Sequence, residues 1–293
     1  MKFNFNIVGE KMNISSKYHI SARKLDFINI NLSGDNKIFV DPLKLKKGDT
    51  EFQKVCYQKV DNFMRNLLNL VKEKDFKQAT EIIENLYERN ETKLGYSLET
   101  KFGKSFGKSG GKVLVKTLAK SDMLLTGKVE DIFDCIIMLP NIGEDKVSDL
   151  ITTIIFLDLV SYTQEQCKKW NIPMKEQKLE KLCWNSEREE WEKIKANLPI
   201  HKQKPIVFIP RDIASNKIEF SYEKLYREVI IPLYKQRELE DLQSNLVIKY
   251  KNGKKQVMGN KLRKLYPCTK YVILDFVQKY DRYYREFKGK IIE

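Results

Sequence analysis

The chain has 293 residues, of which 42% are hydrophobic and 32% are charged, and its formal net charge is +14. This length and this apolar content are enough for a packed core, which excludes a chain that is mainly disordered. No apolar run approaches the ~18 to 20 residues that a membrane-spanning helix needs, and the N-terminus lacks the apolar core of a secretory signal. We therefore expect a cytoplasmic protein with no membrane partner.

The positive charge is concentrated in two segments. Residues 101–120 contain six lysines and no acidic residue, and residues 249–293 contain thirteen lysines and arginines against four acids. Concentrated positive charge attracts phosphate backbones and accelerates their association. Nucleic acid, either DNA or RNA, is the expected partner. The alternative is a lysine-rich surface that serves only solubility.

The cysteines and histidines do not indicate a disulfide, metal or catalytic site. The five cysteines are scattered and never form a C-x-x-C pair, which argues against a disulfide framework and a structural zinc site. We expect them to be reduced and mostly buried. The two histidines, His19 and His201, have no paired spacing, so histidine-based metal sites and nucleases are not supported.

In the first 90 residues the apolar pattern changes from alternating to helical. Alternation over residues 24–32 and 37–40 predicts two strands joined by a turn. Helical spacing over residues 51–88 predicts two amphipathic helices that separate near Lys74.

The middle of the chain predicts a loop, a strand and a long helix. Residues 95–111 carry several glycines and predict a loop, followed by a helix over 112–120. The apolar run 129–139 predicts a buried strand. Residues 145–170 predict one long helix that is apolar nearly all round and hence buried.

The last third combines short strands with helices. The apolar segment 205–210, bracketed by prolines, predicts a short strand, and residues 221–237 predict a helix. Two or three short helices are expected in the final basic region, over residues 260–266 and 269–280 and, for the third, over residues 281–287.

The glycine-bearing segment is the first candidate site. Gly107-Lys108-Ser109 resembles the end of a phosphate-binding loop, but Phe102 stands where G-x-x-x-x-G-K-[ST] requires glycine. Backbone amides and lysines in a glycine loop can still bind phosphates. The alternative is an exposed surface loop. The residues predicted here to contact nucleic acid are Lys101, Lys104, Lys108 and Lys112.

Paired carboxylates are the second candidate. Asp145 and Asp149 are four residues apart and share a face of the predicted helix. Acids at a helix start also stabilise its dipole, but Asp149 lies one turn further in and gains little from it. Carboxylates that follow a strand suit Mg²⁺, which takes oxygen ligands and activates water. We expect Asp145 and Asp149 to bind magnesium together with Asp134 or Glu91.

A phosphodiesterase also needs a cation that stabilises the charge developing on the phosphate. Lys146, Lys204 and Arg211 are the candidates for this role. A restriction-endonuclease-like core is a further alternative, but Val207 or Phe208 stands where its second strand needs an acid.

Two stretches beside these carboxylates carry a resemblance. The segment from Ile142 to Leu150 (IGEDKVSDL) and that from Tyr162 to Cys167 (YTQEQC) resemble uncharacterised bacterial proteins found in phage-defence neighbourhoods. The resemblance implies a nucleic-acid-acting defence protein, with a second protein of the same system as a possible partner. It implies no catalytic residue.

The C-terminal region is the last candidate. Residues 260–276 predict a short helix, a turn and a second helix, with tyrosines among the cations. Basic helix pairs dock on a phosphate backbone, and tyrosines stack on bases. The alternative is a helical subdomain whose lysines are only solvated. The residues predicted to contact nucleic acid are Lys261, Arg263, Lys264 and Lys270.

Together these patterns predict an α/β or α+β fold with a mixed sheet, a long buried central helix and a small basic helical C-terminal region. Residues 1–240 would form the core domain and 241–293 the C-terminal region. The predicted function is nucleic-acid binding, with magnesium-dependent cleavage in bacterial antiviral defence as the specific hypothesis. The alternative is a non-catalytic adaptor or sensor of such a system.

Overall fold

The structure, a computed structural model, describes residues 12–34, 36–94, 107–120, 124, 127–139 and 142–293. It combines helices with short antiparallel strand pairs, which makes the fold α+β. The chain divides into two compact units, each assembled from distant segments. Unit 1 comprises residues 1–116 and 143–218, and unit 2 comprises residues 117–142 and 219–293. None of the described helices is long and apolar enough to cross a bilayer.

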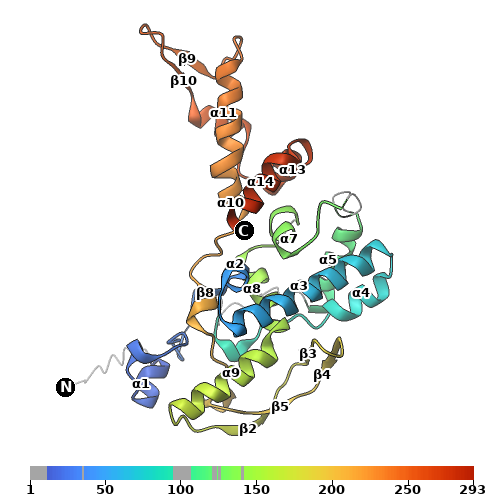
Figure 1. The fold of residues 1–293 in the computed structure, drawn as a ribbon, viewed down its shortest axis with the longest axis vertical. Coiled ribbons are helices and arrows are strands. Elements are labelled where there is room, and N and C mark those ends of the chain that lie inside the picture. The colour runs from blue at the N-terminus through green and yellow to red at the C-terminus, as the bar shows by residue number, and fades with distance from the viewer. Residues whose placement is uncertain (1–11, 35, 95–106, 121–123, 125–126, 140–141) are drawn as a thin grey trace, which may run out of the picture. The chain divides into compact units, whose positions relative to one another are not determined.

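Unit 1 is helical in its first half and carries its strands mainly in its second half (Figure 1). Its helices are α1 (Ile14–Tyr18), α2 (Pro42–Lys47), α3 (Glu51–Lys72), α4 (Phe76–Ile83), most of α5 (Gly107–Ala119), α8 (Glu144–Ile154) and α9 (Phe156–Lys169), with short 3-10 turns η1 (Ala22–Lys24), η2 (Asn90–Thr92) and η3 (Arg211–Ile213). Its strands are β1 (Phe39–Val40), β2 (Lys175–Lys178), β3 (Cys183–Asn185), β4 (Glu190–Glu192), β5 (Lys195–Leu198), β6 (Ile200–His201), β7 (Lys204–Pro205) and β8 (Ala214–Ser215).

The predicted helix pair is confirmed as α3 and α4. A capping box between Thr50 and Gln53 starts α3, and the Asp75 side chain caps α4 by accepting from the Gln78 amide. Both helices bury one apolar face, and they pack against each other. The local signals and the tertiary packing agree here, which explains why the prediction succeeds.

The predicted loop over 95–111 differs from the structure where it can be compared. Residues 107–111 are the first turns of α5 rather than a loop. A Cβ atom on Gly111 would lie 3.0 Å from Cγ2 of Ile83. The glycine at 111 therefore allows α5 to approach the end of α4 closely, and chain flexibility is not its role.

Two further predictions are corrected by helices. The apolar run 129–139 is not a strand but contains helix α7 (Ile132–Met138), which Asp131 caps by accepting from the Asp134 amide. All seven residues of α7 are buried, so its sequence shows no amphipathic period. The long helix predicted over 145–170 is interrupted at Ile155, which separates α8 from α9.

The N-terminal strands do not pair with each other as predicted. Strand β1 pairs instead with β8, and residues 26–28 run antiparallel to residues 209–211. The amide of Ile28 donates to the carbonyl of Ile209, and the amide of Arg211 donates to that of Asp26. The alternating pattern thus marks extended chain whose partner is distant in the sequence.

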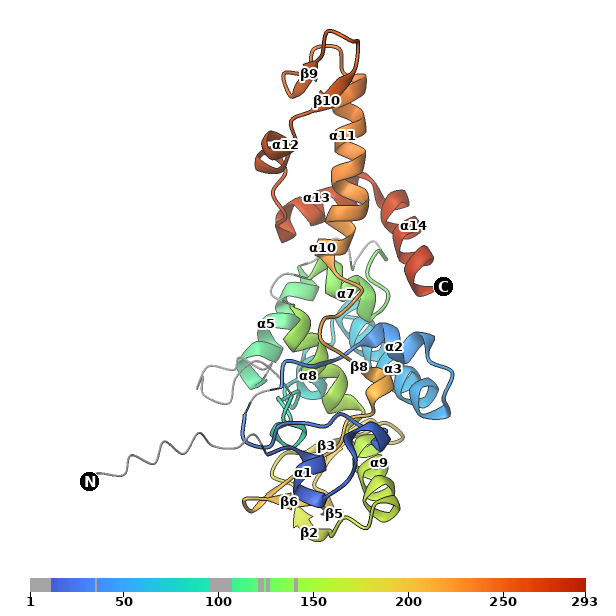
Figure 2. The same cartoon turned by 90° about the vertical axis from the view of Figure 1, so that its left-hand side faces the viewer.

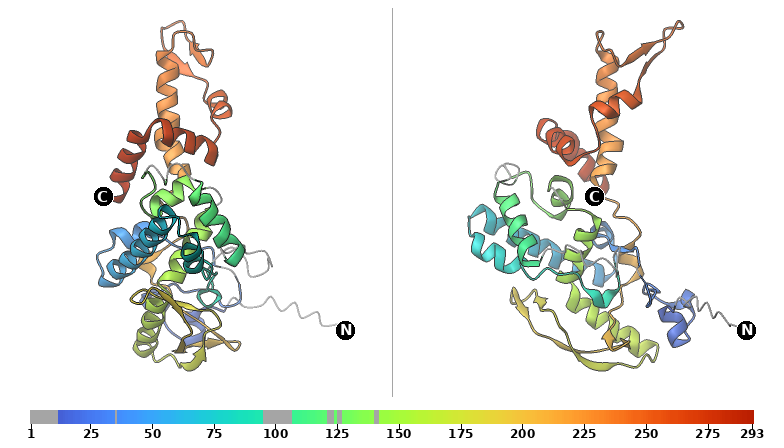
Figure 3. Two further views of the ribbon diagram at one scale, coloured as in Figure 1. Left: turned by 90° about the vertical axis from the view of Figure 1, so that its right-hand side faces the viewer. Right: turned by 180° about the vertical axis from the view of Figure 1, so that it is seen from behind.

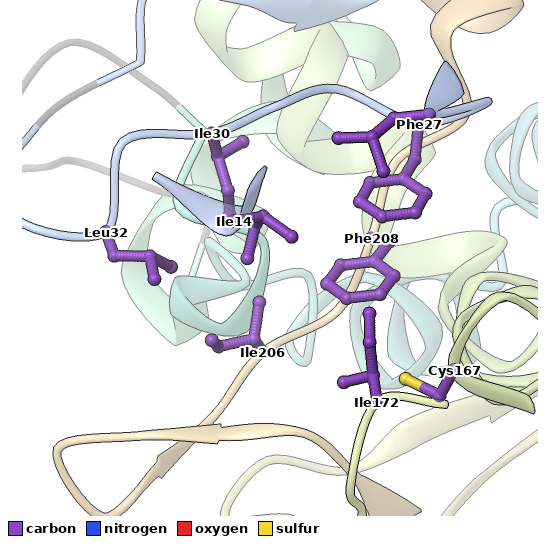
Figure 4. Packing of buried hydrophobic residues seen from close by; sticks show 9 residues of the cluster. Ile14, Phe27, Ile30, Leu32, Cys167, Ile172, Ile206 and Phe208 are labelled. Carbon is purple, nitrogen blue, oxygen red and sulfur yellow. The ribbon is translucent and has the colours of Figure 1, made fainter. Parts of the chain in front are cut away.

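This pairing closes a hydrophobic cluster (Figure 4). The rings of Phe27 and Phe208 stack with centroids 4.1 Å apart and planes 4° apart. Around them lie further buried residues from the N-terminal segment, α9 and the chain just after it, and the 205–210 segment, namely Ile14, Leu25, Ile30, Leu32, Cys167, Ile172 and Ile206. The amide of Phe208 donates to Oγ1 of Thr163, which ties the stacked pair to α9.

The polar stretch between α9 and residue 205 folds into antiparallel hairpins. Strands β2 and β5 pair, and so do β3 and β4 and β6 and β7. Trp184 on β3 lies opposite Trp191 on β4, and its ring meets Phe63 of α3 edge to face at 5.0 Å. The strands form two-stranded pairs rather than the single mixed sheet that the sequence predicts.

Unit 2 is helical apart from one hairpin (Figure 2). Its elements after α7 are α10 (Tyr222–Leu225), the π-helix η4 (Tyr226–Ile230), α11 (Ile231–Glu240), β9 (Val247–Lys249), β10 (Lys255–Val257), α12 (Gly259–Leu265), α13 (Lys270–Lys279) and α14 (Asp281–Ile292). The predicted helix over 221–237 and the three C-terminal helices are confirmed. The hairpin β9–β10 was not predicted.

The π-helix has a local cause. Pro232 has no amide hydrogen and cannot donate to the carbonyl four residues before it. The chain widens by one residue, and the amide of Ile231 donates to the carbonyl of Tyr226. Helices α10, η4 and α11 therefore continue as one rod, beside which α13 and α14 lie (Figure 3).

Helix α14 is anchored by a buried carboxylate. Asp134 of α7 is fully buried and accepts from the Tyr284 hydroxyl at 2.5 Å and the Lys288 ammonium at 2.8 Å through one oxygen. Its other oxygen accepts from the Glu130 amide at 2.9 Å. Lys288 also pairs with Asp131 at 2.9 Å. Burial and the Asp134 charge raise the pKa of Asp131, so Lys288 holds together two carboxylates that repel each other.

Removal of the Lys288 ammonium should release α14. Lys288→Met leaves a buried carboxylate without a compensating charge, and we expect the free energy of opening α14 to fall by about 3 kcal/mol. Amide hydrogen exchange of α14 measures the effect, with the exposed Lys290→Met as the matched control. Equal protection of α14 in the two variants would contradict the anchoring role.

Candidate functional site

Among the residues that the structure describes, the strongest concentration of unpaired positive charge lies in unit 2. We define the cationic arm as residues 247–265, which comprise β9, β10, the turn between them and α12. It holds seven cations and no acidic residue. All seven are exposed, and none forms an ion pair with another described residue. They are Lys249, Lys251, Lys254, Lys255, Lys261, Arg263 and Lys264.

The hairpin sets like charges opposite each other. Lys249 on β9 and Lys255 on β10 are directly paired in the register, which is destabilising in a two-stranded ribbon. The turn closes through Gly253, whose φ of +79° favours glycine and whose amide donates to the carbonyl of Tyr250. The amide of Tyr250 in turn donates to the carbonyl of Lys254. An arrangement that repels itself in the free protein is stabilised by a polyanion.

An exposed apolar face accompanies these cations. Ile248 and Tyr250 are two residues apart on β9 and the turn, and so they face the same side. They are 41% and 45% exposed. The Tyr250 hydroxyl donates to the side chain of Gln256 at 2.9 Å, which fixes the ring beside the lysines.

Helix α12 is held by one buried residue and exposes three cations. Leu262 is 1% exposed, whereas the predicted residues Lys261, Arg263 and Lys264 around it are exposed. Both α12 and β10 pack against α11 (Figure 2). The rod that contains α11 therefore carries both halves of the arm.

Several other C-terminal cations are engaged within unit 2. Lys270, predicted to contact nucleic acid, donates instead to the carbonyls of Ile136 and Ile137. Burial lowers the pKa of Lys270 to about 8. Arg282 pairs with Glu286 at 2.7 Å. The positive charge available to a ligand is therefore concentrated in the arm rather than along the whole C-terminal region.

The glycine-bearing segment is only partly described. Lys101 and Lys104 lie outside the described residues. Lys108 lies on α5, and Lys112 is an exposed residue of the same helix. The predicted phosphate contact at this segment stays a prediction.

The predicted carboxylates Asp145 and Asp149 lie one turn apart on α8. Burial raises the pKa of Asp149 to about 8, with Asp145 and Glu88 adding to the effect and Lys181 opposing it. Burial also raises the pKa of Asp145. This cluster of Asp145, Asp149, Glu88 and Lys181 therefore favours a proton or a cation on Asp149. The sequence pattern did not indicate that Glu88 and Lys181 belong to the cluster.

Two buried groups lie next to this cluster. Arg89 is 2% exposed, stacks over the Phe156 ring at 4.2 Å and donates to the Leu182 carbonyl. Glu91, a predicted catalytic residue, is buried with one side-chain oxygen unpartnered. The charges of Arg89 and Glu91 both influence the pKa of Lys181, and the charge of Lys181 influences the pKa of Asp149. Glu91 is therefore connected to Asp149 through Lys181.

The remaining predicted site residues lie elsewhere. Asp134 belongs to unit 2, where a metal ion would have to displace Lys288 and Tyr284. Arg211 donates to the backbone carbonyls of Phe27 and Ala22 at 3.0 and 2.6 Å.

Lys146 lies on α8 and is half-buried, and Lys204 is exposed on β7. Within the described part of the chain, no group of three or more metal-ligating side chains is arranged around one point. The predicted magnesium site stays a prediction.

The raised pKa of Asp149 predicts a pH-dependent stability. An unfolded aspartate titrates near ~3.9, so between there and about 8 the folded chain holds a proton that the unfolded chain lacks. Rising pH through this window lowers the free energy of unfolding. Asp149→Asn removes the titration, and its stability relative to the unaltered protein should increase from about pH 5 to about pH 8.

Urea unfolding across this pH range measures the difference, with the exposed Glu187→Gln as control. A difference between Asp149→Asn and the unaltered protein that does not change with pH would show that Asp149 is ionised throughout.

Comparison with known proteins gives a family but no activity. The model of the family described as Domain of unknown function (DUF8370) matches residues 19–221, which include α8 and α9 and end before α10. The cationic arm lies beyond the matched residues. No match was found among curated proteins or among solved structures. Because the match covers more than half of its length, the chain belongs to the family described as Domain of unknown function (DUF8370).

Proposed function

We propose that this protein binds nucleic acid through the cationic arm. The observation that carries the proposal is the set of seven exposed cations on β9, β10, the turn between them and α12, with no carboxylate in the same stretch of chain. Each phosphate that such a cation neutralises releases a condensed counterion, which is the main source of sequence-independent affinity. The arm concentrates these contacts on one short hairpin and one short helix.

The aromatic and apolar residues of the arm support a contact with bases as well as phosphates. Tyrosine stacks on an unpaired base of any sequence. Tyr250 is held in place by Gln256, and lysines flank it on both sides in the chain. The chemistry therefore suits a single strand or a strand end, and DNA and RNA present the same groups to it.

Metal-dependent cleavage of the bound strand is the second candidate. Its support is Asp149, whose pKa is raised first by burial and then by the charges of Asp145 and Glu88, so that a positive charge beside the ionised carboxylate would be stabilising. A divalent cation would hold water against a phosphate there, and Lys181 is the nearby cation. The resemblance of residues 142–150 and 162–167 to proteins from phage-defence neighbourhoods supports extending the proposal to antiviral defence, in which a non-catalytic adaptor would bind without turnover.

Neutralising the arm should weaken binding and reduce its salt dependence. In Lys254→Gln/Lys255→Gln, the slope of log K against log salt should fall in magnitude by about 0.9 for each lost phosphate contact on duplex DNA. Fluorescence anisotropy with labelled duplex and single-stranded oligonucleotides measures both quantities.

The control is Arg282→Gln/Lys290→Gln, which removes two exposed cations of α14 and changes the net charge equally. If the slope of log K against log salt falls by the same amount in both double variants, binding follows net charge alone and the arm is not the site. Retention of the full slope by the arm variant would also exclude it.

Cleavage is tested on supercoiled plasmid and on RNA, with Mg²⁺ and with a chelator. If α8 holds the metal, Asp145→Asn and Asp149→Asn should abolish magnesium-dependent cleavage while the salt slope of binding stays unchanged. Cleavage at the unaltered rate by both variants would remove α8 from the active site. Binding without any turnover by the unaltered protein would favour the adaptor.

A further inference from the structure

Unit 1 contains a pocket that the cationic arm does not involve. Its volume is about 460 Å³, within the range of small-molecule sites. Three parts of unit 1 form its walls: the paired backbones around residues 25–26 and 210–212, the start of α3 and one face of α9. The lining residues are Leu25, Asp26, Thr50, Phe52, Tyr162, Gln166, Pro210, Arg211 and Asp212.

Two side chains of α9 reach this pocket with hydrogen-bonding capacity unused. Tyr162 and Gln166 are four residues apart and share one helix face. The Tyr162 hydroxyl and Oε1 of Gln166 are buried and have no partner. Gln166 is 8% exposed. A buried polar atom without a partner costs roughly what a lost hydrogen bond does, so a ligand that supplies donors would be stabilised here.

Two of the three charged residues that line the pocket are already engaged, and the third, Asp212, is an exposed carboxylate at its edge. Asp26 pairs with Lys169 at 2.5 Å, and Arg211 is held by two backbone carbonyls. Burial, with the charges of Asp26 and Asp212, raises the pKa of Tyr162, so its hydroxyl keeps its proton. The buried groups that lack a hydrogen-bond partner are a neutral amide and a neutral hydroxyl. An uncharged polar ligand suits these two groups better than an ion does.

The apolar part of the pocket favours a flat ligand. The rings of Phe52 and Tyr162 lie 5.5 Å apart and are tilted by 51°. Leu25 and Pro210 complete an apolar lining. A glutamine amide carries an acceptor and a donor side by side. This pair matches an amino group next to a ring nitrogen, as a glutamine recognises adenine.

We propose that this pocket binds an amino-substituted nucleobase, adenine or cytosine, with Gln166 hydrogen-bonded to the amino group and the adjacent ring nitrogen. The base packs against Phe52, and the Tyr162 hydroxyl bonds to its edge. A free nucleoside and an unstacked base of a strand share this chemistry. The proposal does not depend on nucleic-acid binding by the cationic arm, which belongs to the other unit.

The ligand series tests this on the unaltered full-length chain. Adenosine and cytidine should bind saturably in a calorimetric or NMR titration. Purine riboside, which lacks the amino group, should bind at least about tenfold more weakly, because one hydrogen bond is lost and Oε1 stays unpartnered. Equal affinity for adenosine and purine riboside, or no saturation at millimolar adenosine, would overturn the proposal.

Two variants test the residues. Gln166→Met keeps the side-chain volume but removes the amide, and Tyr162→Phe removes only the hydroxyl; each should weaken adenosine binding about tenfold or more. The control is Glu165→Gln, an exposed residue of the same helix, which should bind as the unaltered protein does. Unchanged adenosine affinity in Gln166→Met would also overturn the proposal. If that variant does not fold, the ligand series still decides.

Binding of an oligonucleotide distinguishes a base within a strand from a free nucleoside. If Gln166→Met weakens binding of oligo(dA) as it weakens binding of adenosine, the pocket accepts a base within a strand. If only adenosine binding weakens, the ligand is a free nucleoside. Lys254→Gln/Lys255→Gln should leave adenosine affinity unchanged, so a failed arm and a failed pocket give different results.

Discussion

The antiparallel pairing of residues 26–28 with 209–211 is the interaction on which unit 1 depends. It joins segments nearly two hundred residues apart and brings the rings of Phe27 and Phe208 into contact. Thr163 then fixes α9 to the same strand. The pocket has its walls on these three segments and on the start of α3, so its shape follows from the closure of the core.

Unit 2 shows a different balance between stability and charge. Its interior places carboxylates and cations in pairs, with Lys288 between Asp131 and Asp134. The arm leaves its cations unpaired and sets two lysines directly opposite each other. Self-repulsion of this kind lowers the stability of the free hairpin and is relieved by a negatively charged ligand. The same unit therefore neutralises charge where it is buried and exposes it where a ligand can reach.

Sequence patterns predicted those elements whose signals are local. Helices α3 and α4 were found because their apolar faces and caps agree, and the C-terminal helices because their apolar spacing is regular. Helix α7 was mistaken for a strand because all of it is buried, which removes the periodicity. The β9–β10 hairpin was missed although Asn252-Gly253 is a turn signal between two short β-rich runs. The pocket was not predictable, since its walls meet only through long-range pairing, and neither was the ion pairing that occupies Asp134.

The π-helix at residues 226–230 has a consequence for the arm. It inserts one extra residue into the rod that runs from α10 to α11, because Pro232 cannot donate the hydrogen bond that a regular α-helical turn needs at this place. Loss of a single residue from this turn would return the spacing before Pro232 to that of a regular α-helix, in which the proline ring clashes with the carbonyl four residues before it. The rod would then kink at this point and carry α11, with the hairpin and α12 that pack on it, in a new direction relative to α10. The direction in which the lysines point is thus encoded by the length of one turn, and a one-codon deletion there would redirect them without altering any of their side chains.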